Sequence, residues 1–311
     1  MSALTERLVL ISLLFALVFA GYALVRWAGD LKRIGHALSA FVFNIALPVM
    51  LFHLMSNQAG FPPVDMRLLL AFFGGCLLVF LLGRLVAARG FGLDGVSGSV
   101  FALGGVFSNN AMLGLPVARI MLGDAAIPAV ALVMVFNALV LWTLVTVSVE
   151  WARHGSFSWI GFARTGGRVL ANPIVIGVLL GCGWGMTGWQ LPLTLDRGLE
   201  LVGDSTGPLA LVALGMSLAE FGVVASWRVS LAISGIKLLL QPLVVWLLAL
   251  ALGLPDIETQ AVVLLASMAV GANVYLMARQ FRALEGPVAS SLVLSTALAS
   301  VTTPLMLALT H

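Results

Sequence analysis

The sequence predicts an all-α membrane protein of ten transmembrane helices, arranged as two inverted five-helix repeats in which helices four and nine are broken and cross. Three observations lead to this fold class. Of 311 residues, 61% are hydrophobic and only 9% are charged, whereas an ordinary soluble domain carries about 25% charged residues. The chain divides into ten apolar stretches of about 20 residues, the length that one bilayer span requires. Polar residues and glycines interrupt two of these stretches in corresponding places of the two halves, a pattern typical of discontinuous membrane helices.

The ten spans are predicted near residues 8–27, 34–55, 68–88, 95–122, 125–151, 169–187, 201–219, 229–252, 259–279 and 288–309. The connections between them are too short for a separate soluble domain or a nucleic-acid surface, so we expect the protein to act in or across the membrane, in contact with lipid. The first stretch lacks the cationic region and the cleavage site of a secretory signal, and it is predicted to remain as a span.

The Lys and Arg residues are distributed unevenly around the predicted spans. Most of them lie at span ends in the odd-numbered connections: Arg26, Lys32, Arg33, Arg84, Arg89, Arg153, Arg164, Arg168, Arg228, Arg279 and Arg282. Fewer lie on the other side, which also carries both termini: Arg7, Arg67, Arg119 and Arg197. Because positive charges accumulate in cytoplasmic loops, both termini are predicted to lie outside the cytoplasm.

Residues 1–155 are predicted to form the first five-helix repeat and residues 156–311 the second. Five crossings place the start of the second repeat on the opposite side of the membrane, so two similar halves would be inverted. The separation of Pro48 from Pro208 is nearly the same as that of Asn110 from Asn273. A nearly constant offset is what a duplicated unit leaves behind.

Span four carries Ser108, Asn109 and Asn110 in its middle, followed by Pro116. A buried Asn amide needs several hydrogen-bond partners, and one interpretation is that these side chains join neighbouring helices. Pro116 favours the other interpretation, a break that faces a solute, because proline cannot donate to the helical ladder.

Span nine carries Gly271, Ala272 and Asn273 but no proline, so a tight packing contact is the alternative to a second break. If both helices break and cross, their half-helix N-termini offer free N–H groups and partial positive charge to an anion such as a carboxylate. Asn44 in span two is a further candidate for lining this site, and the alternative is that its neighbour Pro48 only kinks the helix.

Three ionisable residues fall within or near the spans and are candidates for coupling or charge pairing. Lys237 could pair with substrate or with Asp204, and the alternative is that its long side chain snorkels to the cytoplasmic interface. Asp204 is the best coupling carboxylate, unless it lies at the outer mouth of span seven. His53 could carry a proton, although its place near a span end favours an interfacial hydrogen bond.

Other features point to no cofactor or metal. Cys76 and Cys182 fall within predicted spans, where a thiol is usually a small packing residue. Gly177, Gly181 and Gly185 recur every four residues and predict close helix packing or dimerisation. The chain has no His-Glu-x-x-His metal motif and no Walker loop, so an intramembrane enzyme is less favoured than a secondary transporter. A channel or a sensory membrane protein is the main alternative.

Three motifs resemble the auxin efflux carrier family, whose bacterial members include malonate and other organic-acid permeases. They are residues 41–55, residues 109–116 followed by Leu122-Gly123-Asp124, and residues 207–218. The resemblance covers nearly the whole chain, and the spacing of Asn109, Gly114 and Pro116 is its most specific part.

The resemblance implies a bile acid/sodium symporter-like fold with a scaffold and a transport domain, each assembled from both repeats. It implies that Asn109 and Asn110 contact a substrate carboxylate, that Pro116 shapes the crossover, and that small organic anions cross by an elevator-like displacement. It also implies a homodimer in a bacterial inner membrane.

The chain departs from the plant carriers of this family in three ways. Ser108 stands where they have a proline, and span nine has no proline in residues 269–274. The long cytosolic loop of the plant carriers is also absent between spans five and six, so regulation through that loop is not expected.

Overall fold

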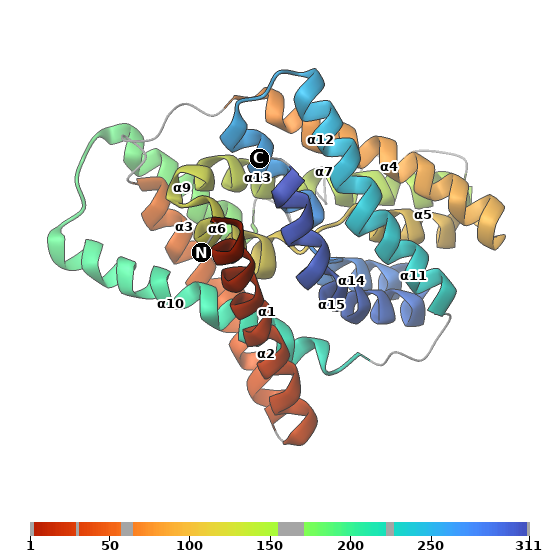
Figure 1. Cartoon of the computed structure of the whole chain (residues 1–311), viewed down its shortest axis with the longest axis horizontal. Helices are drawn as coiled ribbons and strands as arrows, with labels where there is room; N and C mark the ends of the chain where they lie inside the picture. Colours follow the sequence, from red (N-terminus) through yellow and green to blue (C-terminus); the bar gives the residue numbers. More distant parts are fainter. Residues whose placement is uncertain (1–2, 29–30, 57–64, 155–170, 222–226, 310–311) are drawn as a thin grey trace. The chain divides into compact units, whose positions relative to one another are not determined.

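The computed structural model describes residues 3–28, 31–56, 65–154, 171–221 and 227–309, and it is drawn in Figure 1. These residues form helices and connections, with one isolated antiparallel bridge between Ser108 and Val270 and no strand. The predicted all-α class is therefore confirmed for the described part of the chain. The predicted repeat boundary at 155 and 156, and two of the counted cations, Arg164 and Arg168, lie outside the described residues.

In chain order the elements are α1 (Ala3–Trp27), α2 (Lys32–Phe41), η2 (Val42–Ala46), α3 (Leu47–Ser56), α4 (Arg67–Phe91), α5 (Gly95–Gly104), η4 (Asn110–Gly114), α6 (Leu115–Leu122), η5 (Asp124–Ala126), α7 (Ile127–His154), α9 (Pro173–Thr187), α10 (Leu193–Leu218), α11 (Trp227–Gly235), η6 (Ile236–Leu240), α12 (Gln241–Ala251), α13 (Asp256–Ser267), α14 (Ala272–Phe281) and α15 (Glu285–Leu309). The turns η2, η4 and η6 are π-helical, and η5 is a 3₁₀ turn.

Six continuous helices of the described chain are long and apolar enough to cross a membrane: Lys32–Ser56, Arg67–Phe91, Asp124–Arg153, Leu193–Leu218, Trp227–Ala251 and Glu285–Leu309. Four further apolar helical segments are shorter: the part Leu13–Trp27 of α1, Gly95–Gly104, Asn110–Leu122 and Pro173–Met186. Predicted spans four and nine are not single long helices, because each is interrupted in its middle. Length and composition thus support an integral membrane protein, while the ten-span inverted repeat stays a prediction.

Each of the three π-helical turns ends two residues before a proline. The prolines are Pro48 after η2, Pro116 after η4 and Pro242 after η6. A proline has no N–H and its ring collides with the carbonyl four residues earlier, so the preceding turn widens to the longer π spacing. The widened turns contain Asn44, Asn110 and Lys237, one in each.

The helices form two compact units, and each unit is made of segments from both halves of the chain. The first unit consists of Met1–Val64, Ala111–Val135 and Arg168–Glu220. The second unit consists of Asp65–Asn110, Phe136–Gly167 and Phe221–His311. Helix α7 contributes its first residues to the first unit and the rest to the second.

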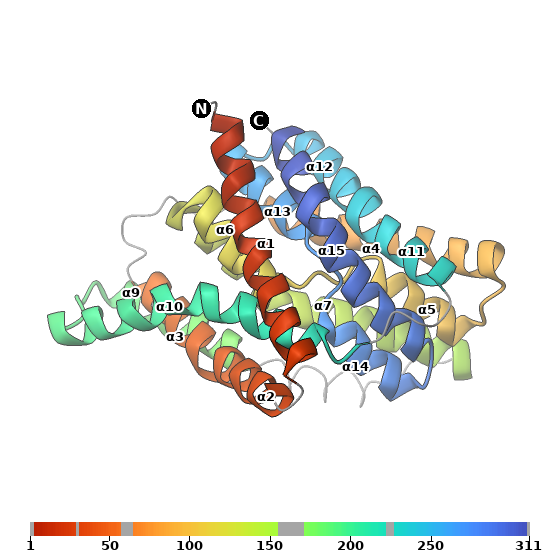
Figure 2. The ribbon, with the colours of Figure 1, turned by 60° about the horizontal axis from the view of Figure 1, so that its bottom comes forward.

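The first unit is built on two close helix pairs, α1 with α10 and α3 with α9. Figures 1 and 2 both show α1 crossing α10. Glycines of α9 allow this helix to lie close to α3. A Cβ added to Gly177 would lie 2.5 Å from the carbonyl oxygen of Pro48, and one added to Gly181 would lie 2.6 Å from the carbonyl oxygen of Phe52. Of the two predicted roles for the glycine stripe, close packing is therefore observed, and its partner is α3 of the same chain.

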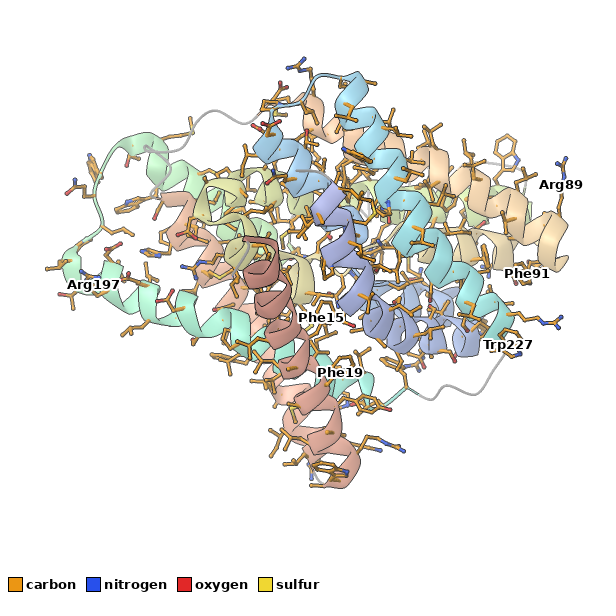
Figure 3. The ribbon with its side chains drawn as sticks, in the orientation of Figure 1. Phe15, Phe19, Arg89, Phe91, Arg197 and Trp227 are labelled. Carbon is orange, nitrogen blue, oxygen red and sulfur yellow. The ribbon has the colours of Figure 1, made fainter. Side chains whose placement is uncertain are left out.

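The second unit packs α4 against α5 and α12, α12 against α13, and α11 against α15. The last pair runs side by side in Figures 1 and 2. Helix α5 begins with an N-cap, because the carboxylate of Asp94 accepts hydrogen bonds from the N–H groups of Val96 and Ser97. The bond from Ser97 is the main cause that holds the pKa of Asp94 below its usual range. Figure 3 shows Arg89 near the end of α4 and Trp227 at the start of α11.

Candidate functional site

The first break lies between α5 and η4. Helix α5 ends at Gly104, and residues 107–109 belong to no helix before η4 begins at Asn110. In this gap, Ser108 forms the isolated bridge with Val270, and the N–H of Asn109 donates to the carbonyl of Ala269 at 2.9 Å. Span four is therefore interrupted where its polar residues predicted a break.

The second break lies between α13 and α14, although span nine has no proline. Helix α13 ends at Ser267, Met268 is extended (φ −66°, ψ 156°), and Gly271 is the N-cap of α14. The N–H of Gly271 donates to the carbonyl of Phe107 at 2.8 Å, and the N–H of Val270 donates to Oγ of Ser295 at 3.0 Å. The two breaks thus satisfy one another's backbone groups, which is the condition for irregular backbone at membrane depth.

Close approach of the two breaks depends on the absence of a side chain at Gly271. A Cβ added there would lie 3.0 Å from both Cδ1 of Phe107 and the carbonyl oxygen of Ser108. That distance is tighter than an ordinary van der Waals contact, so a larger residue would push the two segments apart. We refer to residues 107–110 and 268–273, all in the second unit, as the crossing.

Polar groups without partners gather at the crossing. Oγ of Ser108 and both amide atoms of Asn110 are buried and have no hydrogen-bond partner among the described residues. A buried polar atom without a partner costs about 1–3 kcal/mol, so these groups are costly to the protein as they stand. Asn109 is also buried, whereas Asn273 is half-buried.

The N-terminus of α14 adds backbone donors. No side chain caps this helix, so its first N–H groups, at Ala272 and Asn273, have no partner within the helix. Ala272 is exposed. Amide, hydroxyl and backbone N–H donors beside the positive end of a helix dipole are suited to holding a carboxylate.

Two side chains from a neighbouring helix hold the ends of the broken helices. Nζ of Lys237 donates to the carbonyl of Ala266 at 2.5 Å, in the last turn of α13. Nε2 of Gln241 donates to the carbonyl of Val106 at 2.8 Å, just after α5. The last carbonyls of a helix have no partner within it, and these two donors supply one at each break.

The expectation that Lys237 snorkels to the interface is wrong. Its side chain is completely buried within the second unit, because the break in span nine leaves a free carbonyl that binds the ammonium group. Asp204, the predicted partner of Lys237, belongs to the first unit, where its Oδ1 lies 3.1 Å from Nη2 of Arg119.

The remaining predicted residues belong to the first unit. Asn44 is exposed, and its Nδ2 donates to the carbonyl of Ala40 at 2.8 Å. Pro116 is buried in the first turn of α6. Nε2 of His53 and Oδ1 of Asp196 are 2.8 Å apart, which matches the predicted hydrogen-bonding role of His53 near a span end.

Asn137 and Glu258 are among the buried polar residues of the second unit that sequence reasoning missed. Asn137 lies in α7 with its Oδ1 unpartnered, and Glu258 lies in the first turn of α13 with its Oε2 unpartnered. Asn137 gave the same signal as Asn110, an amide within an apolar stretch. The N-cap of α13 is Pro255, which has no N–H to donate to Glu258 and so cannot complete a capping box.

One overlooked pattern does not form a nucleophile elbow. Residues 203–207 match the Gly-x-Ser-x-Gly pattern of serine hydrolases, which requires a sharp turn from a strand into a helix. Here they lie inside the continuous helix α10, and Oγ of Ser205 donates to the carbonyl of Val202 in the same helix. This serine is therefore not presented as a nucleophile.

Comparison with known proteins shows the family of the chain. The family described as Membrane transport protein matches residues 8–156 and 165–307. A protein of Rhizobium meliloti (strain 1021) described as "Putative malonate transporter" is 27% identical over 301 residues, which cover 93% of this chain and 91% of that relative. Since the family match extends over most of the sequence, the resemblance to the auxin efflux carriers is confirmed, and the chain belongs to this family of membrane transport proteins.

Proposed function

We propose that the protein is a secondary transporter of small organic anions, carboxylates such as malonate, that works by alternating access. The observation that supports this most is the crossing itself. Two broken helices meet there, and the side chains of Ser108 and Asn110 remain buried without partners. The description of the Rhizobium meliloti relative supports malonate as the first substrate to test.

In this proposal the crossing binds a carboxylate group through neutral donors. Nδ2 of Asn110, the hydroxyl group of Ser108 and the N–H groups at the start of α14 would replace the water lost by the anion. Asn109, Ala272 and Asn273 complete the proposed site. Hydrogen bonds to a charged group contribute about 1.5–3 kcal/mol each, so a few of them hold an anion and still permit its release.

The second unit, which contains the crossing, would act as the transport domain, and the first unit would act as the scaffold. An elevator-like displacement of the second unit would expose the crossing to each side in turn. An anion that leaves the cytoplasm gains about 2.3 kcal/mol per charge for each 100 mV of inside-negative potential, whereas uptake would need a co-ion such as a proton or sodium.

The proposed setting is a bacterial inner membrane with both termini outside the cytoplasm. The uneven distribution of Lys and Arg supports this orientation. A homodimer is proposed by likeness to the plant carriers of the family.

Counterflow of labelled malonate in proteoliposomes tests the function. A carrier loaded with unlabelled malonate accumulates label transiently, whereas a channel lets the label equilibrate. We expect wild-type protein to show counterflow and Asn110→Ala to raise the half-saturating malonate concentration tenfold or more, the loss of about 1.5–3 kcal/mol. Asn110→Asp should abolish counterflow, since it places a carboxylate where the substrate carboxylate binds.

Gln280→Ala is the matched control, because Gln280 is an exposed amide on α14 of the same unit. Normal counterflow in Asn110→Ala would show that the crossing does not bind the substrate. Passive equilibration of the label without counterflow in the wild type would show that the protein is a channel and not a carrier.

A further inference from the structure

A cavity of about 430 Å³ lies within the first unit, between α3, α6 and α10. Its volume falls in the range of small-molecule sites. The wall is mainly apolar and includes Met50, Ile120 and Pro208, and the charged residues that line it are Arg119, Asp124 and Asp204. All the residues that line this cavity belong to the first unit, whereas the residues of the crossing belong to the second.

Arg119 is fixed in the wall by three hydrogen bonds. Its Nε donates to Oδ1 of Asp124 at 3.0 Å, its Nη1 to the carbonyl of Gly203 at 3.2 Å, and its Nη2 to Oδ1 of Asp204 at 3.1 Å. A guanidinium group has five N–H donors, so two donors remain beyond these three bonds. The side chain is only 25% exposed, so its stem and head are held in one place.

The two carboxylates on Arg119 are held much more loosely than the arginine itself. The side chains of Asp124 and Asp204 are 50% and 63% exposed. Their distances to Arg119 are longer than the 2.7–2.9 Å of strong charge-assisted pairs. Solvent-exposed pairs of this kind contribute only about 0–1 kcal/mol. Arg119 is therefore a positioned cation whose present partners are easily replaced.

We propose that this cavity is a second carboxylate-binding subsite, in which a carboxylate group of the ligand takes the place of Asp204 on Arg119. The ligand carboxylate accepts from Nη2 and from the unused donors of the guanidinium, and its short hydrocarbon part contacts Met50 and Ile120. Asp124 remains paired with Nε of Arg119. Its negative charge keeps the affinity for the ligand low, so the ligand can dissociate. The identity of the ligand, a small carboxylate, rests on the proposed function.

The charge arrangement predicts opposite effects for the two kinds of substitution. Removing the charge of Arg119 removes the receptor for the carboxylate. Removing the charge of Asp204 removes the competitor, and it also reduces the negative charge that repels the ligand. Since the pair is worth up to about 1 kcal/mol, Asp204→Asn should tighten binding about three- to fivefold.

The methyl group of Met50 provides a local readout, because this side chain lines the cavity. Purified full-length protein in detergent, labelled with ¹³C at the methionine methyl groups, is titrated with malonate, and Met50→Leu assigns the signal. Malonamide, which has the same skeleton without charge, is the control ligand. We expect a saturable shift of the Met50 signal with malonate only.

The variants are compared with a matched ion pair on α10. Arg197, which Figure 3 labels on α10, and Glu200 form an exposed pair at 2.7 Å, and neither residue lines the cavity. We expect Arg119→Gln to abolish the shift and Asp204→Asn to lower its midpoint about three- to fivefold. Arg197→Gln and Glu200→Gln should leave the midpoint unchanged. If Arg119→Gln does not fold, the midpoint of the malonate titration of Asp204→Asn still tests the proposal.

The proposal is overturned if the Met50 signal does not respond to malonate, or if Asp204→Asn leaves the midpoint where it was. Counterflow by the same wild-type preparation would then show that the proposed transport function stands without this subsite. The shift should also persist in Asn110→Ala, which alters the crossing. Loss of the shift in that variant would assign it to the crossing and overturn the second subsite.

Discussion

The backbone of the two breaks depends on single side chains that come from neighbouring helices. Lys237, Gln241 and Ser295 each bind one backbone atom that a continuous helix would have satisfied itself. Each of these bonds lies in a buried environment, where an unpaired backbone group costs about 1–3 kcal/mol. The breaks are therefore fixed features of the second unit.

Ser295→Ala tests this dependence with the smallest possible change. It removes the acceptor for the buried N–H of Val270, so we expect the free energy of unfolding to fall by about 1–3 kcal/mol. Ser291→Ala, one turn earlier on the same helix, is the control. Ser291 is equally buried, but among the described residues its hydroxyl binds the carbonyl of Val288 in its own helix and no backbone group of either break.

Thermal melting of the purified variants, followed by tryptophan fluorescence, provides the comparison. The melting temperature of Ser295→Ala should lie several degrees below that of Ser291→Ala. Equal melting temperatures would mean that the N–H of Val270 finds another acceptor and that the break is adaptable.

At single positions, the sequence identified the polar residues of the crossing better than it identified their partners. Asn110 was found because an amide in an apolar stretch is conspicuous. The burial of Lys237 was not foreseeable, because its acceptor, the carbonyl of Ala266, is free only if α13 ends where it does. A lysine at the same depth beside an unbroken helix would have had to reach the interface.

Among the elements, the π-helical turns connect sequence to structure most directly. Pro48, Pro116 and Pro242 each follow such a turn by two residues, since the missing N–H of proline widens the preceding turn. Pro208 and Pro304 lie inside α10 and α15 without one. A proline within an apolar stretch therefore signals a π turn here but does not ensure it.

The contact between α3 and α9 yields a prediction at the same scale. A Cβ on Gly177 would lie 2.5 Å from the carbonyl oxygen of Pro48 and 2.8 Å from its Cα. Backbone atoms cannot turn aside as a side chain can, so Gly177→Ala should force the helices apart and lower the free energy of unfolding by about 1–3 kcal/mol.

Gly183→Ala is the control on the same helix, because a Cβ there would meet nothing within 4 Å. Alanine is favoured over glycine inside a helix by about 0.5–1 kcal/mol, so this variant should melt at or above the wild-type temperature. Thermal melting followed by tryptophan fluorescence compares the stability of Gly177→Ala with that of Gly183→Ala. A Gly177→Ala variant as stable as Gly183→Ala would show that α9 can move away from α3 at no cost.

The break in span nine shows where prediction of elements from sequence stops. Gly271 and Asn273 suggested it, but the interruption in span four had a proline and this one has none. The break forms because residues 107–109 lie opposite and exchange hydrogen bonds with residues 269–271. That partner is more than 150 residues away in the sequence, so no local pattern encodes it.

For the whole molecule, the sequence predicted two consecutive repeats, and the family resemblance implied two domains that each combine segments of both repeats. The two compact units also combine segments of both halves. Hydrophobic stretches and charges reveal the order of the helices, but they do not reveal which helices pack together. The glycines that permit close packing, such as Gly75 against Val245 of α12, become informative only when the partner is known.

The proposed elevator mechanism predicts that a covalent link inside the second unit leaves transport intact, because this unit moves as one body. A Cβ built on Gly98 of α5 lies 3.6 Å from Cβ of Ala87 of α4, which is within the range for a disulfide. The pair Ala87→Cys and Gly98→Cys in a Cys182→Ala background should form this link on oxidation, as measured by the loss of free thiols. Malonate counterflow should remain within about twofold of that of the reduced protein, and Ala87→Cys alone serves as the control.

If α4 and α5 instead separate to open a path for the substrate, the linked protein would lose counterflow on oxidation and regain it on reduction. That result would exclude rigid displacement of the second unit.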